Sequence, residues 1–417
     1  MISEKIFKNP PAEDRIKPFW FWNSKLERDE LLKQIDDMHE KGIGGFFIHA
    51  RFGLETEYLS KEWFDCIRLC IERAEQYSME VWIYDENPFP SGIGGLKVSK
   101  QPSFRSRYID CIECFLKAGD RVLPSFPGKV LSVQCIRESG LKPLPFMLSN
   151  GRVNLKEQLG EHTKLAVFVE RILKNPNDKI FGIDYMNEDA VRYFFETTHE
   201  VYAKNLGEYF GKTIKGIFTD EPTLLPWHQD INWYIARGNG RVVPWNEKVY
   251  EILNQRYGYN IDTIMAAVFY SDDSRMQDVR RNFWAVVGEL YEKNFFKLYS
   301  EWCRSHGLVL TGHVLLEEGM YFNTIFQGNI IKNLEYFDMP GVDHLTKTAE
   351  ENGLEFLVGN APHIPKMKTN IQGQKLVVSA AHLSGNKKVL SESFGVSGWG
   401  LSIEDMKWIV NWQYVLG

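Results

Sequence analysis

The sequence alternates short apolar runs with amphipathic helical segments, and this alternation restricts the fold more than any other feature. Helical periodicity marks residues 26–41, 62–77, 188–210 and 403–415, and a further long helix that ends near Ser305. The apolar runs are residues 19–23, 45–49, 81–86, 214–222, 308–313, 339–343 and 388–392. Buried strands that are each followed by an amphipathic helix form a parallel sheet covered by helices, so the pattern predicts an α/β fold.

Polar residues stand at the carboxyl ends of nearly all these predicted strands. They are Asn23, His49, Asp85, Asp220, His313, Asp343 and Glu392. No glycine-rich phosphate loop follows the first strand, which disfavours a doubly wound nucleotide-binding sheet. Strand ends that converge in one bowl are typical of a (β/α)8 TIM-type barrel, and this is the predicted fold.

The barrel pattern has one interruption and one missing strand. Residues 100–183 hold short β-rich segments punctuated by Pro and Gly, which predicts an inserted antiparallel module within a catalytic barrel formed by residues 1–99 and 184–417. Only seven strands are found in the 417 residues, and the chain stops where strand eight should begin. We therefore expect a barrel lacking strand eight and a fragment of a larger enzyme.

Composition excludes several functional classes. The chain has 49 Lys and Arg against 55 Asp and Glu, a net charge of -6, and no basic cluster, so we expect no nucleic-acid partner. No run reaches the roughly 18 apolar residues of a membrane span, and the first residues lack a secretory signal, which predicts a cytoplasmic protein without a membrane partner. The six scattered cysteines indicate reduced structural thiols. Oligomeric state is left open.

Two carboxylates are the candidate catalytic pair. Glu221 and Glu392 end the fourth and seventh predicted strands, which would face each other across a barrel. Glycoside cleavage needs one carboxylic acid to protonate the leaving oxygen and one carboxylate to act as base or nucleophile, and their separation decides between inversion and retention. Glu317 and Glu318, after the fifth strand, are an alternative source of the second carboxylate.

Aromatic and polar residues near the strand ends are candidates for sugar binding. Aromatic rings stack on the apolar face of a pyranose, although core packing is an alternative for each ring. Metal ligation is the alternative for the histidines, and a hard-cation site or a turn for the Asp85-Glu86 pair. The predicted substrate-binding residues are Trp22, His49, Arg51, Asp85, Glu86, Asp220, Trp227, His313, Glu317, Glu318, Asp343 and Trp399.

An ordered set of motifs resembles a known family. The motifs are Pro18-Phe19-Trp20-Phe21-Trp22-Asn23, Gly44-Gly45-Phe46-Phe47-Ile48-His49-Ala50-Arg51, Trp82-Ile83-Tyr84-Asp85-Glu86 with Pro90-Ser91-Gly92, Phe218-Thr219-Asp220-Glu221-Pro222, Thr311-Gly312-His313 and Ser391-Glu392-Ser393-Phe394-Gly395. In this order they resemble the N-terminal catalytic barrel of the GH106-type α-L-rhamnosidases over nearly the whole chain.

The resemblance implies an inverting glycoside hydrolase that acts on an oligosaccharide or other glycoside. It also implies calcium as a candidate cofactor and β-sandwich domains downstream. A carbohydrate-binding barrel that no longer cleaves its ligand is the alternative from another functional class. A metal-dependent hydrolase or isomerase is a third hypothesis, and it requires a tight cluster of His and carboxylate ligands.

Overall fold

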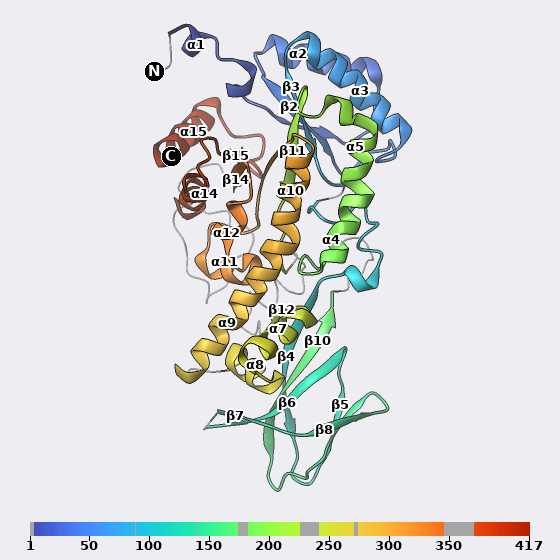
Figure 1. The fold of residues 1–417 in the computed structure, drawn as a ribbon, viewed down its shortest axis with the longest axis vertical. Helices are drawn as coiled ribbons and strands as arrows, with labels where there is room; N and C mark the ends of the chain where they lie inside the picture. The colour runs from blue at the N-terminus through green and yellow to red at the C-terminus, as the bar shows by residue number, and fades with distance from the viewer. Residues whose placement is uncertain are drawn as a thin grey trace.

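The structure is a computed structural model of the chain and describes residues 4–87, 89–138, 140–173, 182–225, 242–270, 274–345 and 371–417. The molecule is elongated, with a parallel sheet and most helices in one half and antiparallel strands in the other (Figure 1). No described helix combines the length and apolar character needed to cross a membrane. All six cysteines are free thiols, which confirms the prediction from their spacing.

The larger sheet has seven strands in the order β1-β2-β3-β11-β13-β14-β15, and all pairings are parallel. Its strands are β1 (Phe19–Trp22), β2 (Gly45–Ala50), β3 (Glu80–Tyr84), β11 (Ile214–Asp220), β13 (Val309–His313), β14 (Met339–His344) and β15 (Leu390–Ser393). Each predicted apolar run is therefore a strand. Because the strands are parallel, their carboxyl ends lie along one edge of the sheet.

The predicted (β/α)8 TIM-type barrel is wrong. The sheet is an open half-barrel whose described pairings begin at β1 and end at β15, and no described strand joins these two. Closing a barrel requires hydrogen bonds between the two edge strands, and seven strands in this order leave both edges open. The alternation of strand and helix predicts a parallel sheet, but it does not encode whether the sheet closes.

Helices pack on the convex side of the sheet and along its edges. They include α2 (Arg28–Glu40), α3 (Lys61–Gln76), α4 (Glu188–Phe194), α5 (Glu200–Leu206), α9 (Ser274–Tyr291), α10 (Leu298–Ser305), α11 (Met320–Gln327), α12 (Ile330–Leu334), α14 (Ile371–Leu383) and α15 (Ile403–Leu416). The short helix α1 (Glu4–Lys8) precedes them, and π-helical turns join α4 to α5 and α9 to α10. The largest cluster of buried apolar side chains lies between these helices and the sheet.

Alternation along the strands sends a second set of aromatic side chains to the concave face. Phe47, Tyr84 and Phe218 pack there around Phe19, whose ring centroid lies 4.8 Å from that of Phe218. This cluster fills the concave side, so side chains at the carboxyl ends of the strands lie above an apolar floor.

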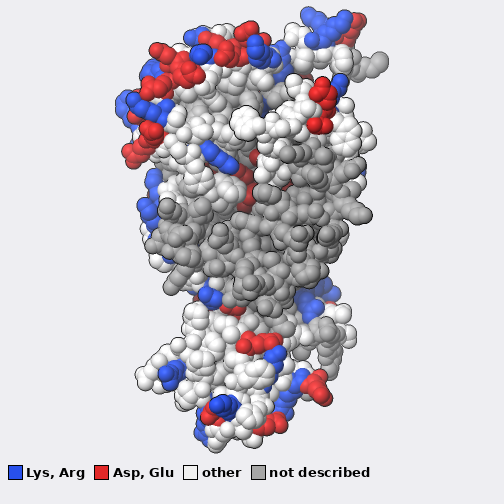
Figure 2. All heavy atoms as spheres, turned by 180° about the vertical axis from the view of Figure 1, so that it is seen from behind, with Lys and Arg blue, Asp and Glu red and all other residues white. Residues whose placement is uncertain are grey.

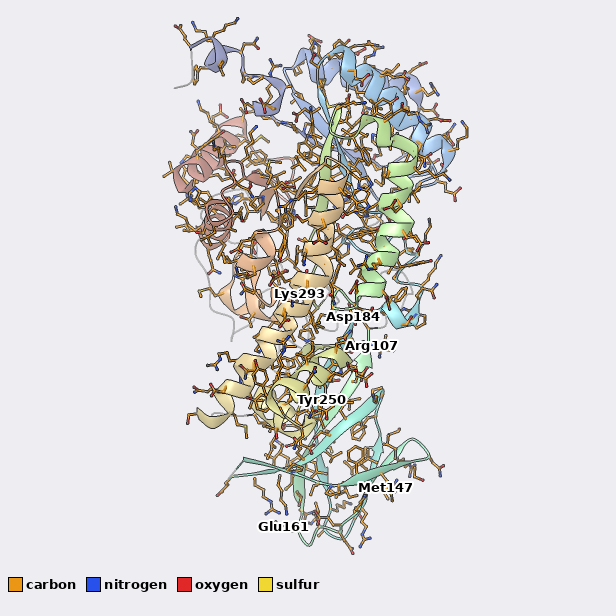
Figure 3. All side chains as sticks on the ribbon, in the orientation of Figure 1. Arg107, Met147, Glu161, Asp184, Tyr250 and Lys293 are labelled. Atoms are coloured by element: carbon orange, nitrogen blue, oxygen red, sulfur yellow. The ribbon has the colours of Figure 1, made fainter. Side chains whose placement is uncertain are left out.

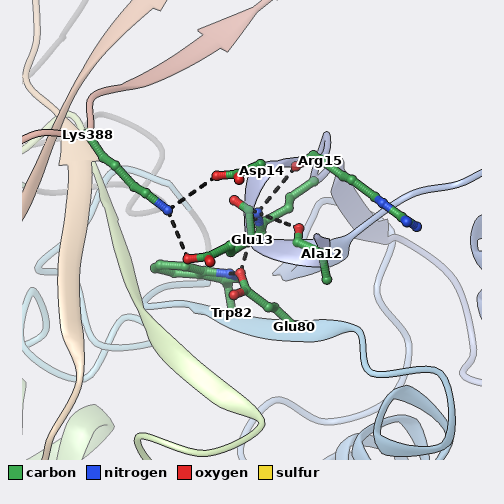
Figure 4. A network of polar contacts seen from close by, with 8 residues as sticks. Ala12, Glu13, Asp14, Arg15, Glu80, Trp82 and Lys388 are labelled. Atoms are coloured by element: carbon green, nitrogen blue, oxygen red, sulfur yellow. Dashed lines mark hydrogen bonds and ion pairs between the residues drawn. The ribbon is translucent and has the colours of Figure 1, made fainter. Parts of the chain in front are cut away.

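Ion pairs connect the two edges of the open sheet at the amino-terminal ends of its strands. Lys388, just before β15, places Nζ 3.1 Å from Glu13 Oε2 and 3.6 Å from Asp14 Oδ1 in the turn that precedes β1 (Figure 4). A pocket of about 1100 Å³ opens at this end of the sheet, with Phe47, Trp82 and Leu390 in its lining. These contacts lie at the end opposite to the predicted catalytic carboxylates.

Antiparallel strands form the other half of the molecule. A five-stranded sheet has the order β12-β4-β10-β6-β7, and a three-stranded sheet has the order β5-β9-β8. The strands are β4 (Arg107–Leu116), β5 (Val122–Ser125), β6 (Lys129–Arg137), β7 (Gly140–Pro143), β8 (Phe146–Ser149), β9 (Arg152–Leu155), β10 (Thr163–Ile172) and β12 (Val242–Trp245). A separate cluster of buried side chains forms their core.

The junction between the two halves contains polar side chains. Arg107 and Asp184 lie there, whereas Met147 and Glu161 lie toward the far end of the antiparallel strands (Figure 3). Arg107 pairs with Glu170 at 2.7 Å, and Asp184 accepts a 2.6 Å hydrogen bond from Asn246. Helices α7 (Glu247–Tyr257) and α8 (Ile261–Phe269) follow β12, and α8 packs against β6.

Candidate active site

Five ionisable residues converge at the carboxyl ends of four neighbouring strands. Register places Asp220 of β11 beside His313 of β13, and Asp343 of β14 beside Glu392 of β15. Glu221 follows Asp220 directly. Figure 2 shows acidic side chains recessed in a hollow of the upper half of the molecule. Parallel pairing therefore gathers residues that are far apart in the sequence.

His313 is the centre of this group. Its Nε2 lies 2.7 Å from Glu392 Oε2 and 3.6 Å from Asp220 Oδ1. Ligand-type atoms of Asp220, Glu221 and His313 lie within 4.8 Å of one another, and the same holds for His313, Asp343 and Glu392. Glu221 and Glu392, the predicted catalytic pair, thus both approach one imidazole.

The backbone around the group is unusually constrained. Glu221 has φ of 50°, a left-handed conformation that L-residues with side chains rarely adopt, and its N–H donates to the carbonyl oxygen of His313. Gly312 has φ of 135°, and a Cβ there would lie 2.0 Å from the Thr219 carbonyl oxygen. Only glycine permits β11 and β13 to approach this closely, and this approach brings Asp220 next to His313.

Protonation differs sharply between the members of the group. Burial and the charge of Asp220 raise the pKa of Glu221 well above its usual value, so this carboxyl keeps its proton to higher pH than an ordinary glutamate does. Burial alone would lower the pKa of His313, but its hydrogen bond to Glu392 and the charges of Asp343 and Asp220 raise that pKa well above its usual value. His313 is therefore an imidazolium paired with Glu392.

Asp220 is held from the β3 side of the site. Tyr84, the last residue of β3, donates its hydroxyl to Asp220 Oδ2 at 2.5 Å. Burial raises the pKa of Asp220 to about 6, against the opposing effects of His313 and the Tyr84 hydrogen bond. Tyr84 was absent from the predicted site. The alternation of side chains along β3, which places it on the concave face with Trp82, is the signal that finds it.

Two further acidic residues, Glu317 and Glu318, lie near Asp343 and His313. The N–H of Asp343 donates to Glu317 Oε1 at 2.7 Å. Burial and the charge of Glu318 raise the pKa of Glu317 to about 8, and burial raises that of Glu318 to about 7. Asp343 Oδ1 and Glu318 Oε2 are buried, and neither has a hydrogen-bond partner among the described residues. The alternative carboxylates predicted from the sequence thus belong to the same acidic group.

His49 and Arg51 lie on the β1–β2 side. The His49 ring stacks on Tyr84 with centroids 3.5 Å apart, and its Nδ1 lies 2.9 Å from the Ala50 carbonyl oxygen. Burial and the charge of Arg51 lower the pKa of His49 to about 3, so its ring is neutral at physiological pH. The structure connects His49 to Asp220 through Tyr84.

Asp85 and Glu86 accept hydrogen bonds that hold the segment after β3 in place. Asp85 accepts hydrogen bonds from Ser91 Oγ at 2.5 Å and Tyr299 Oη at 2.7 Å, and the same Ser91 oxygen accepts the N–H of Asp220 at 2.6 Å. Glu86 accepts three backbone N–H groups, from Asn87, Gly94 and Gly95, each at 2.8 Å. Ser91 was also absent from the predicted site, although it lies in the Pro90-Ser91-Gly92 motif that follows Asp85 and Glu86.

Of the three aromatic residues predicted to stack on the sugar, one is buried, one is exposed and one lies outside the described residues. Trp22 is 2 % exposed and packs edge-to-face on Trp63 in the helix-side core. Trp399 is fully exposed in the segment after β15. Trp227 lies outside the described residues. Phe21, which the sequence reasoning passed over, is 47 % exposed and contacts the His49 ring.

The residues of the site differ in how well they suit calcium, which prefers clustered oxygen ligands. Asp85 and Glu86 do not fit, because their oxygens already accept hydrogen bonds from protein groups. The Asp343 carboxylate fits better, because its ligand-type atoms lie within 4.8 Å of those of His313 and Glu392, and its Oδ1 has no hydrogen-bond partner among the described residues.

A solved protein structure has a fold similar to that of this chain. The solved structure of a rhamnosidase from Novosphingobium sp. PP1Y matches with a TM-score of 0.61 at 15% sequence identity, over 99% of this chain and 55% of that chain. The fold is similar to that of a rhamnosidase. This chain therefore spans about half the length of that protein. No protein-family model and no curated protein matches.

Proposed function

We propose that the chain is a glycoside hydrolase in which Glu221 is the general acid and Glu392 the general base. The observation that carries the proposal is the convergence of these two carboxylates on His313 in contrasting environments. Burial raises the pKa of Glu221 so that it keeps a proton to donate, whereas Glu392 is paired with an imidazolium. Glycoside hydrolysis needs this combination of a proton donor and a proton acceptor.

The proposed reaction uses the two carboxyl groups on opposite sides of the sugar. Glu221 transfers its proton to the glycosidic oxygen as the bond to the anomeric carbon breaks. Glu392 removes a proton from a water molecule whose oxygen bonds to that carbon from the other side, which inverts the configuration. The products are the free sugar and the alcohol of the leaving group, and each carboxyl group returns to its starting state through solvent.

The substrate class is inferred from two sources. The ordered motifs resemble the GH106-type α-L-rhamnosidases, and the fold is similar to that of a rhamnosidase structure. Together they favour an α-L-rhamnoside. A cytoplasmic location remains a prediction from the sequence.

We propose calcium as the cofactor of the same site, held on the side of Asp343, so that Glu221 carries its proton and Glu392 acts as base without ligating the ion. Bound there, a divalent cation would polarise sugar hydroxyls and offset the negative charge of the group. Calorimetric titration of the protein with calcium tests this, with Asp343→Asn as the variant that should weaken binding. Equal affinity in the two proteins would contradict the assignment.

The product anomer distinguishes the proposed reaction from its alternatives. Proton NMR during hydrolysis of an aryl α-L-rhamnoside should show the β-anomer first, with the α-anomer rising only by mutarotation. Initial α-anomer would indicate retention and would overturn the role of Glu392 as base. Binding without turnover would favour the carbohydrate-binding alternative.

A further inference from the structure

Arg51 has an unusual position for a partly buried arginine. It directly follows β2, and its N–H donates to the Trp22 carbonyl oxygen at 3.1 Å, which fixes it at the ends of β1 and β2. Its guanidinium lies over the Phe21 ring, 5.3 Å from the centroid. In the described part of the chain no carboxylate forms an ion pair with it, whereas Arg107 and Arg171 each pair with a carboxylate at 2.7 Å.

The charge of Arg51 acts on the candidate active site. It is among the causes that lower the pKa values of His49 and Asp220. A continuous path of contacts leads the same way, from Phe21 to the His49 ring, from His49 to Tyr84 and from Tyr84 to Asp220. Arg51 therefore lies close to His49 and Asp220.

The proposed reaction fixes which part of the substrate can offer a carboxylate to Arg51. Rhamnose, the sugar that is released, has no carboxyl group, so a carboxylate in the substrate belongs to the leaving group.

The surroundings also select for the kind of group that Arg51 can bind. The acidic residues of the site repel an anionic substrate unless a positive charge compensates, and His313 is already paired with Glu392. A guanidinium presents a planar fork of donors that matches a carboxylate with two parallel hydrogen bonds. Phe21 orients the fork through a cation–π contact, and no described residue accepts a hydrogen bond from the guanidinium.

We propose that Arg51, supported by Phe21, binds a carboxylate on the leaving-group side, so that the substrates are glycosides of uronic acids or of similar acidic acceptors. The inference rests on the proposed function, which identifies rhamnose as the released sugar. The binding of the carboxylate itself can be measured without turnover.

The test is calorimetric binding to the Glu221→Gln protein, which removes the proposed proton donor and prevents consumption of the ligand. The probes are a rhamnosyl-galacturonic acid disaccharide and its methyl ester, in which a methyl group removes the charge of the carboxyl group. We expect the acid to bind at least about tenfold more tightly than the ester, because only the carboxylate accepts two charge-assisted hydrogen bonds from the fork. Adding Arg51→Gln should reduce this ratio to about one.

Two further variants control for charge and folding. Arg51→Lys keeps the charge without the fork and should give an intermediate ratio. Arg281→Gln removes an exposed arginine on α9 that pairs with Asp278, and it should leave the ratio unchanged. Equal binding of acid and ester before any change at Arg51, or a ratio that survives Arg51→Gln, would overturn the proposal.

The binding ratio separates this proposal from the proposed function. Failure of the wild-type protein to hydrolyse any rhamnoside would contradict the hydrolase while the ratio still reports on Arg51. A rhamnosyl-galactose 6-sulfate probe tests the choice of anion. We expect it to bind more weakly than the uronate, and equal binding would overturn the assignment to a carboxylate.

Discussion

A single histidine determines how charge is distributed among the carboxylates of the site. His313 is buried with Asp220, Glu221, Asp343 and Glu392 around it, and it forms its shortest contact with Glu392. Glu221 lies beside Asp220 in a buried position that raises its pKa, whereas Glu392 contacts His313. The proposed roles of acid and base therefore rest on position rather than on residue type.

The protonation of Glu221 predicts the alkaline limb of the pH profile. The raised pKa keeps Glu221 protonated to pH values well above 4.5, and the rate should fall as pH rises through that pKa because the proton to be donated is lost. The measurement is kcat/KM against pH on a rhamnoside with a poor leaving group. The Glu221→Gln variant should lack this limb, and a limb that persists in the variant would assign it to another group.

Prediction from the sequence anticipated that the carboxylates and His313 would lie together, because polar residues at the ends of parallel strands share one edge of the sheet, whereas their catalytic and binding roles stay predictions. It was less successful for aromatic residues. In Phe19–Trp22 the alternation of faces decides which ring meets the site, and Trp22 points to the helices while Phe21 points to His49. The strand pattern does not state which face is concave, so the sequence favoured the larger ring.

At the scale of the elements, the strands were predictable and their closure was not. The predicted run 339–343 is the strand Met339–His344, and the predicted run 19–23 is Phe19–Trp22. Strand β12 was missed because Val242–Trp245 is short, contains a proline and pairs with β4, more than 100 residues earlier in the sequence. Local periodicity reports burial, whereas pairing between distant strands depends on the whole chain.

The loop that follows β3 is held in place by the buried side chain of Glu86. Both carboxylate oxygens of Glu86 accept backbone N–H groups, and the side chain is fully buried. Glu86→Gln replaces one acceptor by an NH₂ donor that faces an N–H, so we expect a loss of about 1–3 kcal/mol in the free energy of unfolding.

Urea denaturation measures this loss. Glu157→Gln, at an exposed position, is the matched control and should change the free energy of unfolding by less than about 0.5 kcal/mol. Equal stability of the two variants would show that the hydrogen bonds to Glu86 do not hold the loop.

For the whole molecule, buried carboxyl groups couple stability to pH. Burial raises the pKa of Asp85 to about 7, and burial raises that of Glu86 to about 8 with a contribution from Asp85. Burial likewise raises the pKa of Asp184 to about 7. In the unfolded chain these groups return to ordinary values near 4, so the folded state binds more protons across the interval between the two pKa values.

The sign of the effect follows from this difference. A raised pKa contributes stability that is full below the unfolded value and is lost as pH rises through the folded value, so the free energy of unfolding should decrease from pH 6.5 to pH 8. His49 and His199, whose pKa values burial lowers to about 3, act mainly below pH 6.5. Urea midpoints at the two pH values measure the change, and an increase would contradict the assignment.

The central claim is that Glu221 donates the proton to the leaving group, and leaving-group dependence tests it most directly. Rhamnosides of an alkyl alcohol and of 2,4-dinitrophenol differ in their need for that proton. We predict that Glu221→Gln lowers kcat/KM on the alkyl rhamnoside by about 10²–10⁴-fold and on the dinitrophenyl rhamnoside only slightly, because a good leaving group departs without protonation. Equal losses on the two substrates would contradict the role of Glu221 as the general acid.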